Sequence, residues 1–127
     1  MTAEQTRMLK HELRTPINHI IGYSELLLEA AMDEGEDLIT DVARTIQKDG
    51  QTLASLVDNH FAAFKGTAPD EVSESLRRAV TPVISAILEN AEPRPDVEEL
   101  WTRDCRRIQA AARKLVLILE PQEEHIP

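Results

Sequence analysis

The residues most able to do chemistry in this chain stand together near its N-terminus. His11 is followed directly by Glu12, and Thr15 comes one helical turn after His11. A carboxylate can accept or orient the proton on one imidazole nitrogen, which leaves the lone pair of the other nitrogen for attack on phosphorus. The hydroxyl of Thr15 could hold a water molecule near that nitrogen. The spacing is compatible with a nucleophilic histidine, but a His-Glu pair on a helix is more often a solvated surface without chemistry.

The elements that must position these residues are all helical. Apolar residues recur at spacings of three and four along the whole chain, and strand signals are almost absent. Glycine and proline then break the pattern at three short connections and at Pro121. The expected helices cover about residues 4–32, 37–64, 70–92 and 96–120. We therefore predict an all-α fold, an antiparallel four-helix bundle made of two tandem helical hairpins.

A helical wheel of the first segment turns His11 away from the interior. At about 100° per residue, the aliphatic residues fall opposite the histidine. Thr15 lies close to His11 on the wheel, so both face solvent. The predicted core residues of the whole chain are Leu13, Ile17, Ile20, Leu53, Val83, Ile108 and Leu115.

The two halves of the chain resemble each other. A shift of 66 residues places Thr15-Pro16-Ile17 on Thr81-Pro82-Val83, and a shift of 62 residues aligns the second helix with the fourth. The expected organisation is a first hairpin at 1–65, a second at 66–121 and a tail at 122–127, together one domain. The first shift places Arg77 and Arg78 at the positions of His11 and Glu12, so the second hairpin is expected to be a degenerate copy without a nucleophile.

The string HELRTPINHIIGYSELLLE, which starts at His11, closely resembles the phosphoacceptor helix, or H-box, of sensor histidine kinases. The resemblance implies that His11 is the phosphoacceptor and that Glu12 assists proton removal. It further implies that Thr15 supports dephosphorylation of a response regulator and that Pro16 bends the helix, with Arg14 as part of the motif. Such domains dimerise through their hairpins, so a degenerate second copy would replace the partner chain. We expect a monomeric pseudo-dimer, although a homodimer remains an alternative.

The same resemblance implies a two-component phosphorelay in which His11 exchanges phosphate with a receiver-domain aspartate. Family members carry an ATP-binding domain after the hairpin, with asparagine- and glycine-rich boxes. This sequence offers only four glycines, none close enough to another for a phosphate-cradling loop. ATP and Mg²⁺ are therefore expected only through a separate kinase domain. The alternative is a noncatalytic regulatory or dimerisation module that docks onto a kinase or response regulator.

Composition excludes several other classes of protein. A net charge of −9 and an aromatic content of 3% disfavour binding to nucleic acid. A single cysteine, Cys105, rules out an internal disulfide and a multi-cysteine zinc site, and no metal-ligand spacing occurs. No apolar run approaches the roughly 20 residues that span a bilayer. We therefore expect no membrane insertion, no bound metal and a cytoplasmic location.

Overall fold

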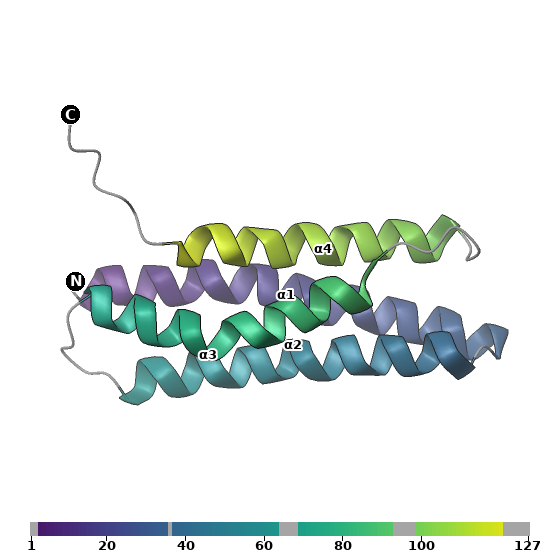
Figure 1. Ribbon diagram of the computed structural model, residues 1–127, viewed down its shortest axis with the longest axis horizontal. Helices are drawn as coiled ribbons and strands as arrows, with labels where there is room; N and C mark the ends of the chain where they lie inside the picture. The colour runs from purple at the N-terminus through teal and green to yellow at the C-terminus, as the bar shows by residue number, and fades with distance from the viewer. Residues whose placement is uncertain (1–2, 36, 64–68, 93–98, 121–127) are drawn as a thin grey trace.

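The computed structural model describes residues 3–35, 37–63, 69–92 and 99–120, and these ranges form four helices (Figure 1). The helices are α1 (Ala3–Glu34), α2 (Asp37–Ala63), α3 (Pro69–Asn90) and α4 (Glu99–Leu119). No strand occurs in these ranges, so the all-α prediction is confirmed. The proposed tail at 122–127 lies outside the described residues.

The four helices form a ring in which neighbours in the chain are neighbours in space. α1 contacts α2 and α4, and α3 also contacts α2 and α4, so α1 and α3 lie on a diagonal. α1 and α3 run in one direction and α2 and α4 run back, as Figure 1 shows. The architecture is the predicted antiparallel bundle of two helical hairpins, α1–α2 and α3–α4.

The ends of the helices follow from local chemistry. Gly35 adopts a φ of 70°, a backbone conformation that glycine accepts at a helix C-terminus. Its N–H donates a hydrogen bond to the carbonyl of Met32 at 3.2 Å and so closes α1. Asp37 opens α2 with a negative charge beside the positive end of the helix dipole. Pro69 stands first in α3, where its missing N–H costs no helical hydrogen bond.

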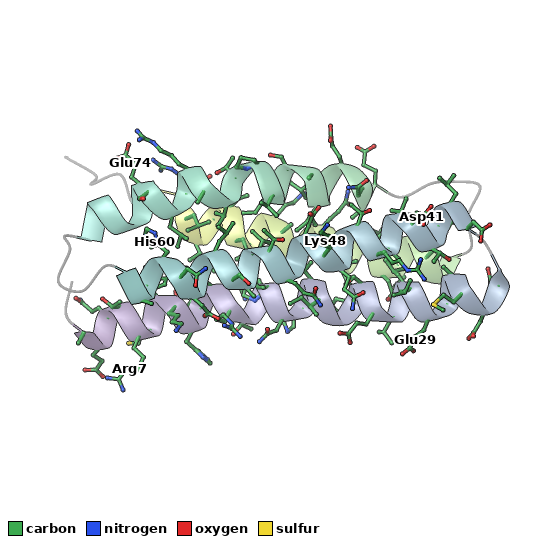
Figure 2. The ribbon with its side chains drawn as sticks, turned by 90° about the horizontal axis from the view of Figure 1, so that it is seen from below. Arg7, Glu29, Asp41, Lys48, His60 and Glu74 are labelled. Carbon is green, nitrogen blue, oxygen red and sulfur yellow. The ribbon has the colours of Figure 1, made fainter. Side chains whose placement is uncertain are left out.

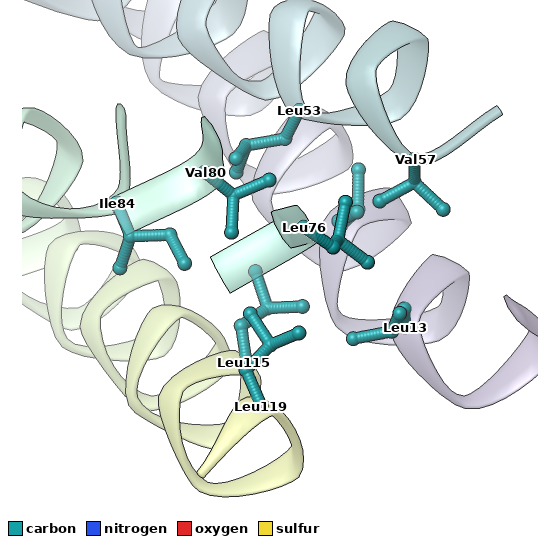
Figure 3. A pocket seen from close by; sticks show the side chains of 9 residues that line it. Leu13, Leu53, Val57, Leu76, Val80, Ile84, Leu115 and Leu119 are labelled. Atoms are coloured by element: carbon teal, nitrogen blue, oxygen red, sulfur yellow. The ribbon is translucent and has the colours of Figure 1, made fainter. Parts of the chain in front are cut away.

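Aliphatic side chains from all four helices fill the interior. A cavity of about 10 Å³ lies between the four helices, in the half of the bundle that contains the first turns of α1 and the last turns of α2 and α4 (Figure 3). It is too small and too apolar to hold a stable water molecule. Its lining residues are Leu13, Ile17, Leu53, Val57, Leu76, Val80, Ile84, Leu115 and Leu119.

Helices α2 and α4 use the same register toward the core. Six positions of α2 are buried, and the residue 62 positions after each of them is also buried. The α2 positions are Ile39, Ala43, Ile46, Gly50, Leu53 and Val57, and those of α4 are Trp101, Cys105, Ile108, Ala112, Leu115 and Leu119. This identity of register matches the shift of 62 residues found in the sequence.

Helix α3 departs from the expected register by one residue. Val83 is only half-buried, and the neighbouring Ile84 takes the core position instead, so the expectation for Val83 is wrong. Val80, Ile84 and Ile87 lie 67 positions after the buried Leu13, Ile17 and Ile20, which makes the structural shift 67 rather than 66. The other predicted core residues are buried.

The change of register also moves the Thr-Pro pair. Pro16 is buried in α1, whereas Pro82 is exposed in α3. The position that corresponds to His11 is therefore Arg78 rather than Arg77, and Ala79 corresponds to Glu12. A proline in a helix constrains only local backbone geometry, and the packing of aliphatic residues decides which face turns inward. The second hairpin has no histidine at either position.

Two glycines inside helices provide a matched test of this packing. A Cβ at Gly50 would lie 2.9 Å from Cγ1 of Ile21 and 3.2 Å from Cγ2 of Ile20, whereas a Cβ at Gly22 would meet nothing within 4 Å. We expect Gly22→Ala to raise the free energy of unfolding by about 0.5–1 kcal/mol through helix propensity. Gly50→Ala should lower the free energy of unfolding by about 1 kcal/mol, because the steric clash with α1 destabilises the fold more than the higher helix propensity of alanine stabilises it. Urea unfolding measures both, and a stabilised Gly50→Ala would contradict the close approach of α2 to α1.

Candidate functional site

His11 lies on the outward face of α1. The aliphatic residues Leu13 and Ile17 anchor the opposite face in the core, and this fixes the rotation of the helix. The side chain of His11 is exposed, and Thr15 on the same stripe is half-buried. The predicted orientation of His11 is confirmed. A docked molecule can therefore reach the imidazole without any opening of the bundle.

Glu12 is also exposed. Within the described residues, Glu12 makes no hydrogen bond or ion pair, so its carboxylate is not held by another group. The two side chains are neighbours on the helix surface, and no hydrogen bond joins them.

Thr15 has a defined local role. Its Oγ1 donates a hydrogen bond to the carbonyl oxygen of His11 at 3.2 Å, which fixes the hydroxyl one turn after His11. The lone pairs of this hydroxyl remain able to accept a hydrogen bond from water. Thr81 makes the equivalent bond to the carbonyl of Arg77, so both Thr-Pro pairs shape their helix in the same way.

Pro16 lies inside α1 without ending it. The helix runs unbroken from Ala3 to Glu34, and the ring of Pro16 is buried. Because proline has no N–H, the carbonyl of Glu12 loses its usual helical donor. One polar backbone atom without a helical donor, the carbonyl oxygen of Glu12, therefore lies beside His11.

Arg14 turns away from His11 and toward α2. Its Nη1 donates to both carboxylate oxygens of Asp58, at 2.6 Å and 2.7 Å, and Nζ of Lys10 lies 3.6 Å from Oδ1 of the same carboxylate. The hydrogen bond from Arg14 holds the pKa of Asp58 below its usual range. The sequence analysis missed Asp58, because no motif marks it and its distance to α1 depends on how the two helices pack.

The opposite flank of α1 is joined to α4 by an aromatic contact. The guanidinium of Arg107 lies over the ring of Tyr23, 5.3 Å from its centroid, and the ring of His19 lies 6.2 Å from that of Tyr23. His19 is exposed, and Trp101 is buried against the core rather than free for a partner.

On the outer surface of α1, Arg7 and Glu29 point away from the bundle (Figure 2).

Neither a metal centre nor a membrane span is found in the described parts of the chain. No group of three or more His, Cys, Asp or Glu side chains there is arranged to hold a metal ion. Among these same residues, no helix has the length and apolar character needed to cross a bilayer. The chemistry that this surface offers is that of the imidazole and its neighbours.

Two aspartates on α2 are expected to affect stability in opposite directions. Burial raises the pKa of Asp49, partly offset by Lys48, whereas Arg14 lowers the pKa of Asp58. Asp58 therefore stabilises the fold above the pKa of an unfolded aspartate, and this contribution is lost as the pH falls through its folded pKa. We expect Asp58→Asn to lower the free energy of unfolding by about 0.5 kcal/mol at neutral pH, a small effect because the pair is partly exposed.

Asp49→Asn serves as the matched comparison on the same helix. Its ionised form is disfavoured in the folded chain, so the amide should raise stability at neutral pH by about 0.5 kcal/mol. Chemical denaturation of both variants at neutral and at acidic pH measures the two effects, and both differences from wild type should shrink in acid. Equal shifts of the same sign at neutral pH would contradict the opposite environments of the two carboxylates.

The sequence of this chain is similar to that of known proteins. The family model of the His Kinase A (phospho-acceptor) domain matches residues 1–64, which are the α1–α2 hairpin. The chain is 30% identical over 97 residues to the sensor histidine kinase AruS of Pseudomonas aeruginosa, a match that covers 73% of this chain and 9% of that protein. An alignment of this length extends beyond residue 64 into the second hairpin.

Other relatives match over a shorter region. The hybrid signal transduction histidine kinase A of Dictyostelium discoideum is 39% identical over 51 residues, 40% of this chain and 2% of that protein. The cell-division control histidine kinase PdhS of Brucella anthropi is 38% identical over 52 residues, 40% of this chain and 5% of that protein. The chain thus spans less than a tenth of the length of these relatives, and no solved structure matches it significantly. By the match of residues 1–64, this chain belongs to the family of His Kinase A phospho-acceptor domains.

Proposed function

We propose that the chain is a phosphotransfer domain of a two-component phosphorelay, in which His11 exchanges phosphate with an aspartate of a receiver domain. The observation that carries the proposal is the exposed imidazole of His11, held outward by the buried opposite face of α1 within the family-matched region. An exposed side chain on a rigid helix can be reached by a second domain at little conformational cost.

The proposed step is a displacement at phosphorus. A ring nitrogen of His11 forms a bond to the phosphorus of an aspartyl phosphate, and the bond from phosphorus to the aspartate oxygen breaks. The carboxylate of the partner leaves with the bonding electron pair. The proton on the other ring nitrogen passes to the carboxylate of Glu12, so the phosphorylated ring does not carry an extra positive charge. The reverse reaction returns the phosphate and the proton by the same path.

The neighbours of His11 take supporting roles in this proposal. Thr15 holds a water molecule that hydrolyses the aspartyl phosphate of a docked receiver, which is consistent with its anchored hydroxyl. Pro16 keeps the carbonyl of Glu12 without a backbone donor. Arg14 positions α1 on α2 through Asp58 and does not contact the reacting atoms.

The first phosphate must come from elsewhere. We propose that a separate ATP-binding kinase domain, with its Mg²⁺, delivers the γ-phosphate of ATP to His11. In that step the P–N bond forms, the bond from the γ-phosphorus to the bridging oxygen breaks, and ADP leaves. This kinase domain belongs either to a longer parent chain or to another protein.

A noncatalytic module is the competing function. The observation in its favour is the second hairpin, which keeps the core register but has Arg78 and Ala79 where the first has His11 and Glu12. On this alternative the bundle binds a kinase or response regulator without exchanging phosphate. Labelling separates the two functions directly.

We expect wild-type protein to take up acid-labile, alkali-stable phosphate from a detached kinase ATP-binding domain with ATP or from a phosphorylated receiver. His11→Gln should abolish the label and leave the melting temperature nearly unchanged, because an exposed residue contributes little packing. Phosphate mapping by mass spectrometry under neutral conditions measures the site.

His19→Gln is the control for this experiment, since His19 is also exposed on α1 and should be dispensable. Glu12→Gln should slow phosphate uptake by about 10²-fold, in the range of general base catalysis, while receiver binding is retained. Tight binding of a receiver without label in wild type would contradict the phosphorelay and favour the noncatalytic module.

We further propose that the bundle is complete within one chain. Among the described residues, each hairpin buries its core face against the other hairpin, so a second copy is not needed to cover the core. Light scattering after size exclusion should give a mass near 14.3 kDa at micromolar concentration. A stable dimer with hairpins paired between chains would contradict this pseudo-dimer.

A further inference from the structure

The outer surface of α4 carries an unusual concentration of positive charge. Five basic side chains, all exposed, form what we call the α4 basic face: Arg103, Arg106, Arg107, Arg113 and Lys114. The chain as a whole has a net charge of −9. A cationic face on such an acidic protein places a strong local field where most of the surface has the opposite sign.

Most of this charge is not neutralised by the bundle itself. Arg107 lies 3.6 Å from Asp104, and its guanidinium also covers Tyr23. Within the described residues, no acidic side chain pairs with the other four members of the face. A shallow hollow of about 380 Å³ is lined by Thr102, Arg103, Arg106, Arg107 and Ala110. Three guanidinium groups around one hollow are suited to bind carboxylates.

The core does not require this surface. Helix α2 packs in the same register as α4, and 62 positions before the five basic residues it has Asp41, Arg44, Thr45, Gln51 and Thr52. The same outward positions on α2 are thus occupied by one acidic, one basic and three uncharged residues. Apart from Arg107, which covers Tyr23, core packing does not account for the basic residues of α4. Their surface distinguishes the second hairpin from the first.

The bundle has two edges beside His11: the α2 edge, between α1 and α2, and the α4 edge, between α1 and α4. They differ in the charge that they offer to a partner. On the α2 edge, Arg14 and Lys10 already contact Asp58, so much of the local positive charge is neutralised. On the α4 edge, Lys114 has no such partner among the described residues. Leu117, one turn further along α4, is 67% exposed and offers an apolar contact.

The α4 basic face lies within reach of a domain docked at His11. Arg107 is level with Tyr23, and α4 runs antiparallel to α1, so Lys114 lies within about two turns of His11 along the bundle axis. Tyr23 is twelve residues after His11, which corresponds to about 18 Å along a helix. A domain of about 100 residues has a radius of gyration of about 13 Å, so one partner can cover both places.

We propose that the protein that exchanges phosphate with His11 docks over the edge between α1 and α4, and that an acidic surface of that protein binds the α4 basic face. The proposal rests on the phosphotransfer function proposed above. A protein is favoured over nucleic acid because the overall charge of −9 repels a phosphate backbone. The aromatic rings near this face are also unavailable for base stacking, since Trp101 is buried and Tyr23 is covered by Arg107.

The test compares charge reversal on the two edges. Arg106→Glu combined with Lys114→Glu changes the α4 face, and Arg44→Glu combined with Lys48→Glu makes the same change in charge on the exposed face of α2 (Figure 2 labels Lys48). Each double variant is given phosphate from a panel of purified phosphorylated receiver domains with acidic or neutral surfaces. Each is also given phosphoramidate, a small phosphoryl donor whose P–N bond breaks as ammonia leaves and which needs no docking surface.

We expect the α4 variant to lose about tenfold or more in kcat/KM with acidic receivers at low salt, because steering by opposite charge is lost. The loss should diminish as salt is added. The α2 variant should stay within about twofold of wild type, and phosphoramidate should label His11 in all three proteins at equal rates. Equal melting temperatures would show that folding is preserved.

The possible failures point to different conclusions. Equal transfer by the α4 and α2 variants, a larger loss in the α2 variant, or labelling by phosphoramidate alone would overturn this docking surface and leave the reactivity of His11 intact. No label in wild type from either donor would overturn the phosphotransfer function and this inference with it. Binding of a fluorescent DNA oligonucleotide at physiological salt, lost in the α4 variant, would assign the face to nucleic acid instead.

Discussion

The burial of one apolar face on each hairpin is the constraint on which the rest of the structure depends. Neither α1–α2 nor α3–α4 can bury its aliphatic residues alone, and each covers the face that the other exposes. This mutual burial fixes the rotation of α1, because Leu13 and Ile17 must point inward. The outward position of His11 is therefore a consequence of core packing rather than of any interaction that the histidine makes itself.

Patterns within one helix could be predicted well from the sequence. The spacing of aliphatic residues was enough for the four helices, for the buried face of α1 and for the shared register of α2 and α4. The register predicted for α3 from the Thr-Pro pair is wrong, because the two prolines occupy different faces: Pro16 is buried and Pro82 is exposed. Local backbone chemistry repeats between the halves, but it does not decide which side of a helix meets the core.

Contacts between helices were beyond prediction for a related reason. The ion pair of Arg14 with Asp58 joins residues 44 positions apart, and its formation depends on the axial offset of α1 and α2. Gly50 contributes to that offset by allowing α2 to approach Ile20 and Ile21 closely. A single sequence shows that position 50 is small, but it does not show which side chains press against it.

The two hairpins share a core register but differ in their outer surfaces, and this difference is possible because both belong to one chain. A dimer of identical hairpins would present the same outer surface twice, so a change to one outer helix would also change the other. In a single chain, α2 and α4 keep one core register while their outer faces differ in charge. Packing is thereby separated from recognition, since the core residues tolerate little change and the outward residues tolerate much. A second hairpin that lacks the His11–Glu12 pair can then carry the surface proposed for a partner, while the first keeps its histidine exposed beside it.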